Sequence, residues 1–442
     1  MAMSTNELRQ KFIDYYVEKG HLEIPSYSIV PKDDPTTLFV SAGMQPMLQY
    51  ILGEPYPTGE TRIVNSQKCF RAVDIEEVGD NRHTTFFEML GNWSFGDYWK
   101  EEQLRWLFSF LLDELGFDPK KLYITVFDGD EENGIPRDEE SVKIWQKLFE
   151  ERGMKAEIGK RIFYYDAKKN WWSREGAPGE MSVGEPGGPD SEIFYEFDVE
   201  HDSAYGEKCH PNCDCGRYLE ICNSVFMEYK KVGEEKFEPL PKKNVDFGGG
   251  LERLAAALNN DPDVFKIDLL WSLVGRVSQE SGRPYDGENM ALMRVIADHL
   301  RAATMMILEG VVPNNKLTGY VVRRLIRRSA VKYHELTGDK FDRMADLCNS
   351  VLDLYSINTP ENQSLVRGVV DEEQKKFARS IERGLKEIEK VDPKEVTGEF
   401  AFDLYQSYGF PFEITREILA KKGIKIDESA FDEAKRQHQM KS

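Results

Sequence analysis

Residues 244–254 read N-V-D-F-G-G-G-L-E-R-L, which sets three consecutive glycines one helical turn before an arginine. Glycine lets the backbone approach a ligand closely and adopt angles that a Cβ would forbid. The next residues, 251–258, predict a buried amphipathic helix with Arg253 near its N-terminus. Unpaired N–H groups and the positive dipole end of such a helix favour a nucleotide phosphate. The alternative is an ordinary glycine-rich loop before a helix.

A second group of charged residues could bind anions. The segment 316–332 carries six basic residues within five helical turns: Lys316, Arg323, Arg324, Arg327, Arg328 and Lys332. Arginines four residues apart on one helix repel each other unless anions or carboxylates lie beside them. Nucleic-acid phosphates and acidic neighbours in this acidic chain would both satisfy them, so the segment alone leaves both readings open.

Bulk composition narrows the class of protein. The chain has 442 residues, 40% of them apolar, which is enough for two or three folded domains. A net charge of −20 argues against a protein that coats itself in nucleic acid. We expect a cytoplasmic, reducing location and no membrane, because the start has no signal pattern, no apolar run is long enough to span a bilayer, and six cysteines make no disulfide framework.

The periodicity of the chain changes near residue 260. Before it, strand patterns alternate with helices and loops, which predicts an α+β fold around an antiparallel sheet flanked by helices. The expected elements are helices at 6–20, 101–115 and 138–153, a hairpin at 62–96 with its loop at 74–82, and strands at 122–127, 192–199 and 219–229. Residues 171–188 are expected to be loop. Residues 264–390 show almost only helical periodicity, so we predict two domains, 1–258 and an all-helical 259–442.

Several phrases of the sequence resemble one family closely. They are P-K-D-D-P-T-T-L-F-V-S-A-G-M-Q-P-M from residue 31, F-F-E-M-L-G-N-W-S-F-G-D-Y from 86, R-Y-L-E-I-C-N-S-V-F-M from 217, V-D-F-G-G-G-L-E-R from 245 and Y-G-F-P-F-E-I-T from 408. Their order and wording resemble motifs 1, 2 and 3 of class II aminoacyl-tRNA synthetases, and specifically those of alanyl-tRNA synthetases. The resemblance runs from residue 6 to about 436.

The resemblance implies activation of L-alanine by ATP and Mg²⁺, followed by transfer to tRNA-Ala. The amino-acid carboxylate is already an anion, so the protein's task is to align two anions and neutralise charge on the phosphate. Arg71 matches the arginine that grips the α-phosphate, Arg253 the one at the γ-phosphate, and Glu220 the Mg²⁺ ligand. The remaining ATP-binding residues implied are Arg82, His83, Phe87 (beneath adenine), Glu88, Met89 and Gly250.

The resemblance also implies an alanine pocket. Asp246 matches the carboxylate that pairs with the substrate ammonium, and Trp172, Asn223 and Gly248 match the other pocket positions. Three of them have an ordinary structural reading as well: Trp172 as core, Asn223 as a turn residue and Asp246 as a helix cap. A pocket for one methyl group distinguishes alanine from glycine or serine by only about 1–3 kcal/mol.

The chain departs from the family pattern in three places. The loop after Arg71 is short and lacks a lysine that relatives use in adenylate formation. A Cys-x-x-Cys of many relatives is replaced by Gly187 and Asp190. Instead, Cys209, Cys213 and Cys215 cluster in K-C-H-P-N-C-D-C with His210 beside them and His201 near, a set that could bind Zn²⁺ or form a reduced cysteine loop. The family's editing and dimerising domains have no counterpart here, so we expect a monomer that is either a fragment or a minimal enzyme.

Recognition of the tRNA is expected in the helical half. The resemblance implies that Arg323, Arg324, Arg327 and Arg328 face the acceptor stem, where backbone phosphates would satisfy them. The two family positions that read a G·U pair are occupied by Leu317 and Gln406; a slip of two residues in the alignment would bring in Asn315 instead. Two other functions stay open at this point, an RNA-binding protein without catalysis and an adenylating enzyme that loads another acceptor.

Overall fold

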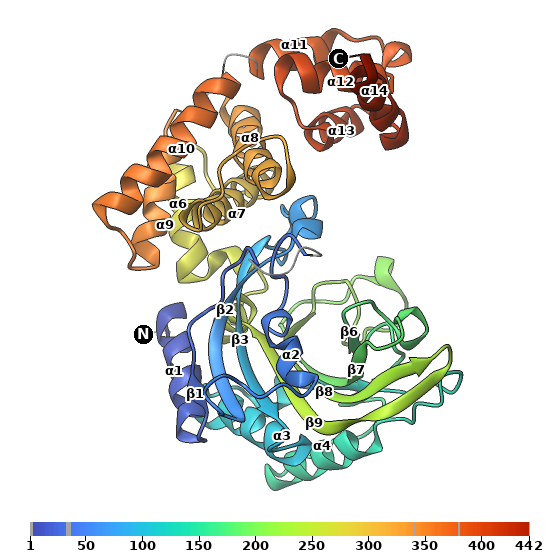
Figure 1. The fold of residues 1–442 in the computed structure, drawn as a ribbon. Coiled ribbons are helices and arrows are strands. Elements are labelled where there is room, and N and C mark those ends of the chain that lie inside the picture. Colours follow the sequence, from blue (N-terminus) through green and yellow to red (C-terminus); the bar gives the residue numbers. More distant parts are fainter. Residues whose placement is uncertain (1–2, 32–36, 340–341, 379–380, 442) are drawn as a thin grey trace. The chain divides into compact units, whose positions relative to one another are not determined.

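The computed structural model describes residues 3–31, 37–339, 342–378 and 381–441, and it divides into two compact units (Figure 1). The first unit comprises residues 1–71 and 87–269, and the second comprises 72–86 and 270–442. Residues 32–36, part of the first family phrase, lie outside the described residues. The domain division at residues 258 and 259 stays a prediction.

The first unit is built on a nine-stranded sheet in the order β1-β2-β3-β9-β8-β7-β4-β5, with β6 paired to β7. The strands are β1 (Leu22–Glu23), β2 (Arg62–Phe70), β3 (Phe86–Phe95), β4 (Leu122–Phe127), β5 (Ile162–Tyr165), β6 (Trp171–Ser173), β7 (Pro186–Glu196), β8 (Tyr218–Gly233) and β9 (Lys236–Gly250). The pairs β1–β2 and β4–β5 are parallel, whereas the pairs that join β3, β9, β8, β7 and β4 are antiparallel. The expected α+β class is confirmed.

Helices cover this sheet on both faces. Figure 1 shows α1 (Thr5–Glu18), α3 (Lys100–Ser109) and α4 (Glu139–Glu151) on one face and the short α2 (Leu48–Ile51) on the other. A capping box fixes the start of α1, because Ser4 and Glu7 each accept a backbone N–H at the helix terminus. Phe12 of α1 then stacks on Phe247 of β9 at 5.7 Å between ring centroids, which anchors α1 to the centre of the sheet.

The second unit is helical apart from the segment 72–86. Its helices are α6 (Asp268–Ser281), α7 (Asn289–Leu308), α8 (Leu317–Thr337), α9 (Met344–Leu354), α10 (Pro360–Ala378), α11 (Ile381–Lys390), α12 (Gly398–Asp403), α13 (Phe412–Lys421) and α14 (Glu428–Lys441). Helix α7 is buried along most of its length and packs on α8. Among the described residues, no helix is long and apolar enough to cross a membrane.

The loop between β2 and β3 belongs to the helical unit. Thr85 donates to Asp298 from its backbone N–H (2.9 Å) and its hydroxyl (2.6 Å). The carbonyls of Ile75 and Gly79 accept from Arg328 (2.7 Å) and Arg294 (3.0 Å). The hairpin periodicity predicted two strands around a polar centre, but it carried no sign that side chains 200 residues later would hold that centre.

The glycine segment differs from its prediction. Gly248, Gly249 and Gly250 are the last residues of β9, and none of them has a φ in the left-handed region. Their lack of a side chain serves close packing instead, because a Cβ on Gly248 would lie 2.9 Å from Met89 Sδ and one on Gly249 would lie 3.1 Å from the Phe247 ring. The glycines therefore form the end of strand β9 and not the expected turn. The chain passes from them directly into α5 (Leu251–Leu258).

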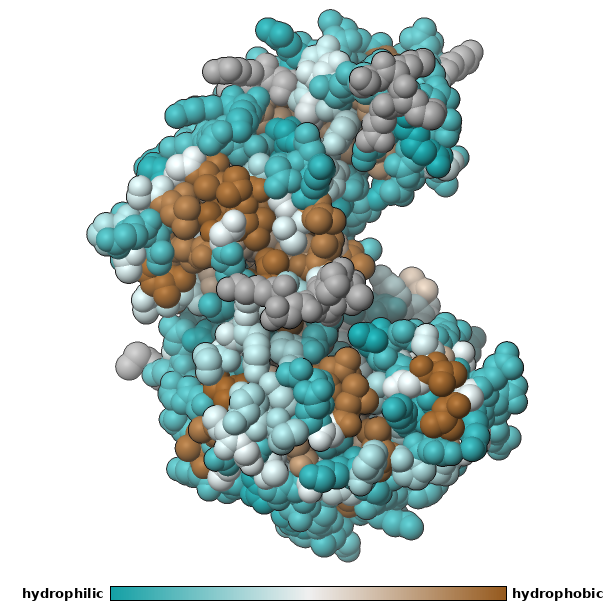
Figure 2. All heavy atoms as spheres, in the orientation of Figure 1, coloured by the Kyte–Doolittle hydropathy of each residue, from teal (hydrophilic) through white to brown (hydrophobic). Residues whose placement is uncertain are grey.

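The surface is largely polar. On the face shown in Figure 2, hydrophilic residues cover most of each unit, and apolar atoms gather over the helices α6 to α10 of the second unit. Large exposed apolar side chains of this unit include Trp271 at 44% and Leu365 at 44%. Isolated exposed apolar residues are normal on folded proteins, so this face by itself indicates no partner.

Close packing between β7 and β8 gives a test of the sheet. We expect Gly188→Ala to destabilise the first unit by about 1–3 kcal/mol, since the added Cβ would meet the backbone carbonyl oxygen of Phe226, which cannot move aside. The matched change Gly179→Ala places its Cβ in open space and should stay within about 0.5 kcal/mol of the parent. Equilibrium urea unfolding measures both, and equal midpoints would contradict the packing.

Candidate active site

Cross-strand pairing gathers the candidate site on one face of the sheet. Residues directly opposite each other in a sheet point to the same face. Trp93 of β3 lies opposite Asp246 of β9, and Asp246 lies opposite Val225 of β8. Two residues further along β9, Gly248 lies between Gly91 and Asn223 in the same way. The register alone therefore places Asn223, Asp246 and Gly248 side by side.

A β-bulge brings Glu220 to this face. Ile193 of β7 lies opposite Cys222 and the next residue, Phe194, lies opposite Glu220, so Ile221 is an extra residue in β8. In a regular strand Glu220 and Cys222 would share a face, which is the face away from Asn223. The bulge reverses the direction of Glu220, whose charge then acts on Asp190 and Glu192.

Arg71 follows β2 directly and lies over Phe87 of β3. Its guanidinium carbon is 4.8 Å from the centre of the Phe87 ring, and its Nε donates to the carbonyl of Ser41 (3.2 Å). Such stacking holds a guanidinium flat while its outer N–H groups remain directed elsewhere. The planar group and the aromatic ring together form a surface suited to a phosphate beside a purine.

Arg253 and Glu220 form an ion pair. Arg253 lies in the first turn of α5, and its Nη1 donates to Glu220 Oε2 (3.0 Å) and to the Glu220 carbonyl (3.2 Å). Both side chains keep about a third of their surface exposed, 29% and 35%. Each group therefore neutralises the other while leaving an open side toward solvent.

Asp246 is buried, and its pKa is raised to about 7. Burial disfavours its charged form and outweighs the nearby Trp93 indole, which lowers the pKa. Asn223 Oδ1 is buried without a hydrogen-bond partner. A buried carboxylate and an unsatisfied amide oxygen on the same sheet face are both acceptors, and both would be satisfied by a small cationic ligand.

Trp172 closes the apolar side of this region. It lies on β6 opposite Gly188 of β7, and it packs against a buried cluster that includes Trp93, Val225 and Met44. A cavity of about 20 Å³ lies beside Trp172 and is lined by Met44, Gln45, Leu48 and Arg174.

Glu88 and Met89, both expected at ATP, are held within the sheet unit. Arg9 of α1 donates to both carboxylate oxygens of Glu88 at 2.6 Å, and Ser66 donates to one of them at 2.9 Å. Met89 Sδ accepts from the N–H of Gly43 at 3.2 Å. Sequence reasoning missed Arg9, because no local spacing connects α1 with β3.

A buried polar network beside Asn223 was also missed. Asn170 donates to Asp190 (2.9 Å) and to Thr125 (2.8 Å), and Thr125 donates to Glu192 (2.7 Å). Burial, together with the charge of Glu220, raises the pKa of Asp190 to about 7 and also raises the pKa of Glu192. The only signal in the sequence was two carboxylates within a run that is otherwise typical of a buried strand.

Arg82 and His83 belong to the second unit. The backbone N–H groups of both donate to Asp80 Oδ1, and His83 Nδ1 lies 2.7 Å from Asp80 Oδ2. Burial opposes these hydrogen bonds, but they lower the pKa of Asp80 to about 2, and the hydrogen bond with Asp80 raises the pKa of His83. The loop thus presents Arg82 and His83 on one hydrogen-bonded turn around Asp80.

Comparison with known proteins shows the family of this chain. The family described as tRNA synthetases class II (A) matches residues 7–442. The Alanine--tRNA ligase of Treponema pallidum (strain Nichols) is 40% identical, with 99% of this chain and 72% of the relative covered. That of Borrelia hermsii is 39% identical over 99% and 72%, and that of Rubrobacter xylanophilus is 37% identical over 98% and 49%. This chain belongs to the class II (A) tRNA synthetases.

The basic helix of this synthetase is largely paired internally. Arg327 and Arg328 of α8 are 4% exposed; Arg327 pairs with Glu373 (2.6 Å) and Arg328 with Glu417 (2.9 Å). Arg323 pairs with Glu373 at 3.4 Å, and Arg324 pairs with Glu76 at 2.9 Å. The acidic neighbours left open as one reading of this segment are therefore present.

One pocket of the helical unit contains several residues expected at the tRNA. It measures about 230 Å³, and its lining includes Asn315, Arg323, Arg327 and Gln406. Gln406 lies in a π-helical turn at Leu404–Tyr408, a geometry that often marks functional sites. Leu317, by contrast, is 69% exposed and is not among the residues that line this pocket.

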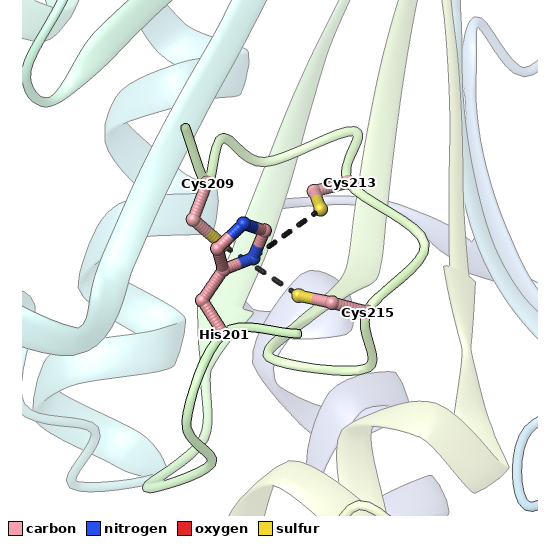
Figure 3. A group of neighbouring side chains, drawn as sticks. All are labelled: His201, Cys209, Cys213 and Cys215. Carbon is pink, nitrogen blue, oxygen red and sulfur yellow. Dashed lines mark hydrogen bonds between the residues drawn. The ribbon is translucent and has the colours of Figure 1, made fainter. Parts of the chain in front are cut away.

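The cysteine cluster contains a different histidine from the expected one. The ligand atoms of His201, Cys209, Cys213 and Cys215 all lie within 4.8 Å of one another (Figure 3). His210 Nδ1 lies instead 2.8 Å from the hydroxyl of Tyr165. His210 was favoured because it is adjacent to Cys209 in sequence, but the loop folds back and brings His201 to the sulfurs.

The Arg253–Glu220 pair leads to a prediction for synthetases of this kind. We expect Glu220→Gln to weaken ATP binding by at least about tenfold when Mg²⁺ is present, because a carboxylate ligand of the cation is lost. Without Mg²⁺ the same change should leave ATP binding equal or tighter, since Arg253 is freed from its partner. Calorimetric titration under the two conditions measures the difference.

Glu228→Gln is the matched control for that variant. Glu228 lies on the same strand and also forms an ion pair, with Lys243 at 2.6 Å. It should bind ATP like the parent in both conditions. Equal loss with and without Mg²⁺ in Glu220→Gln would contradict the assignment of Glu220 to the cation.

Proposed function

We propose that this chain activates L-alanine with ATP and transfers the alanyl group to the 3′ end of tRNA-Ala. The observation that carries this proposal is 40% identity to an Alanine--tRNA ligase over 99% of the chain. A buried acceptor pair on one sheet face, Asp246 and Asn223, supports the ammonium group of an amino acid as the ligand. ATP and Mg²⁺ are the expected cofactors, and we also propose a cytoplasmic monomer.

The first step forms a bond between the alanine carboxylate oxygen and the α-phosphorus of ATP. The bond from that phosphorus to the bridging oxygen breaks, and pyrophosphate leaves with its charge. No proton needs to be removed, so catalysis depends on positioning and on positive charge placed where negative charge accumulates. We assign Arg71 to the α-phosphate and Phe87 to the adenine ring that stacks beside it.

Arg253 and Glu220 would exchange partners when ATP binds. The phosphate chain would take the guanidinium, and the cation that accompanies it would take the carboxylate. Because the two groups neutralise each other beforehand, neither charge is left uncompensated in the partly buried site. Arg82, His83, Glu88, Met89 and Gly250 complete the proposed ATP site.

Alanine selection rests on Asp246, Asn223, Trp172 and Gly248. The Asp246 carboxylate would pair with the ammonium group, and Asn223 Oδ1 would accept one of its N–H bonds. Gly248 and Trp172 would limit the space for the side chain. A site whose acceptors are otherwise unsatisfied rejects a ligand that lacks the donor more strongly than one that differs by a methyl group.

In the second step the terminal ribose hydroxyl of the tRNA attacks the alanyl carbonyl carbon and AMP leaves. We assign acceptor-stem recognition to the pocket that contains Asn315 and Gln406, which can both donate to and accept from a base edge. Arg323 and Arg324 are the proposed phosphate contacts. Arg327 and Arg328 would not contact phosphate directly, because their charges are already paired with Glu373 and Glu417.

Two assays test the function. The purified chain should catalyse alanine-dependent ATP–pyrophosphate exchange without tRNA and should charge tRNA-Ala. Arg71→Ala should lower kcat/KM for exchange by roughly two orders of magnitude, whereas Arg62→Ala, at the other end of β2, should not. Exchange without charging would indicate another acceptor, and RNA binding without exchange would indicate a protein that has lost catalysis.

The raised pKa of Asp246 predicts a pH dependence for alanine. Only the carboxylate form pairs with ammonium, so the KM for alanine should rise as the pH falls below 7, by roughly tenfold per unit. Asp246→Asn should show a high KM that no longer varies with pH, while the KM for ATP stays the same. A KM for alanine that is flat between pH 8 and 6 in the parent would exclude this role.

The pocket lined by Asn315, Arg323, Arg327 and Gln406 predicts which residues read the acceptor stem. Asn315→Ala and Gln406→Ala should each lower kcat/KM for charging roughly tenfold, the value of one good base-edge contact, without changing exchange. Leu317→Ala should have no effect on either. Replacing the G·U pair of tRNA-Ala by G·C should cost less than about a hundredfold, because one of the two positions that read it in relatives is Leu317 here.

A further inference from the structure

Apolar packing contributes little to the order of the connection between β7 and β8, residues 197–217. Residues 202–208 are all exposed, and the segment contains few apolar side chains. A short 3₁₀ turn at Ser203–Tyr205 is its only helical element. Long polar loops of this kind need another source of order, such as a metal ion.

Four side chains of this loop converge on one point. Figure 3 shows the side chain of His201 facing those of Cys209, Cys213 and Cys215. Cys209 Sγ and Cys215 Sγ are 3.6 Å apart, and Cys213 Sγ is 3.8 Å from His201 Nδ1. Ligand atoms arranged tetrahedrally at Zn²⁺ bonding distances lie about 3.5–3.8 Å apart.

We propose that His201, Cys209, Cys213 and Cys215 bind one structural Zn²⁺ ion that fixes the β7–β8 connection. Three thiolates and one imidazole form a soft, four-coordinate donor set that suits Zn²⁺ and excludes Mg²⁺ and Ca²⁺, which prefer oxygen. All four positions come from the protein, so no site remains for a substrate or water. The ion is therefore structural and not catalytic.

The site would order the start of the strand that carries Glu220. Its last ligand, Cys215, is followed by Arg217, which pairs with Glu196 at the end of β7 and whose carbonyl accepts the N–H of Phe197 (2.8 Å). On the other side, His210 contacts Tyr165 at the end of β5. The bound ion thus closes the loop onto strands β5, β7 and β8 just before the bulge at Ile221.

A disulfide is the main chemical alternative. Cys209 and Cys215 are near enough to oxidise, and that bond would leave Cys213 and His201 without a partner. A metal uses all four groups, which is why we favour it. An iron–sulfur cluster would also use thiolates, and its colour and iron content distinguish it from zinc.

Elemental analysis of the purified full chain tests the site without reference to alanine or tRNA. We expect one zinc per chain, with no iron and no disulfide by mass spectrometry after alkylation. His201→Ala and Cys213→Ser should each lose the zinc. His210→Ala and Cys348→Ser are the matched controls, a histidine of the same loop and a buried cysteine of α9, and both should retain it.

Tryptic cleavage after Lys208 provides a second readout that does not depend on activity. Lys208 is exposed and adjacent to Cys209, so removal of zinc with a chelator should increase cleavage there on the order of tenfold. Addition of Zn²⁺ should reverse the effect in the parent but not in His201→Ala. Three results would each overturn the proposal: zinc retained by His201→Ala, a Cys209–Cys215 disulfide, or iron in place of zinc. None of these results would change the conclusion drawn from the alanine-charging assays.

Discussion

Backbone hydrogen bonds hold β3, β9, β8 and β7 in a fixed register, and side chains opposite one another in these strands point to the same face. The candidate site depends on this register throughout. A shift of one residue in β9 would send Asp246 and Gly248 to the opposite face and bring Val245 and Phe247 in their place. The bulge at Ile221 is the single departure from regular pairing that the site requires, since it alone directs Glu220 toward Arg253.

Carboxylates compensate the charge of several buried cations in this protein. The chain carries 78 acidic and 58 basic residues, and the buried cations Arg327, Arg328 and Lys332 each have a carboxylate partner. Burial raises the pKa of Glu417, but Arg328 and Lys332 outweigh burial and lower it to about 2. An ion pair has the same effect in the sheet unit, where Arg253 and Glu220 neutralise each other. Acidic composition therefore serves internal pairing here and is compatible with a partner that is itself an anion.

Local patterns predicted much of the fold. Period-2 and helical spacings located β4, α4 and α5 within about two residues, because burial on one face leaves a clear periodicity. The same reasoning missed β9, where three glycines looked like a turn. Glycines selected for close packing against Met89 and Phe247 are indistinguishable, in sequence, from glycines selected for their backbone angles.

The candidate site was predictable mainly through resemblance. Phrases of the family located Arg71, Glu220, Asp246 and Arg253, but they gave no information on what holds each group. Arg9 beside Glu88, the bulge at Ile221 and the replacement of His210 by His201 in the cysteine cluster all arise from contacts between distant segments. Such contacts depend on tertiary packing, which no local spacing in a single sequence encodes.

The position of residues 72–86 has a consequence for the modularity of this enzyme. These residues lie between β2 and β3 in the chain, yet their partners are Arg294, Asp298 and Arg328 of the helical unit. A chain cut after residue 269 would keep the loop and lose its partners in the helical unit. The two units are thus interleaved along the polypeptide, and neither could be exchanged between proteins by a single crossover without separating a strand connection from its scaffold.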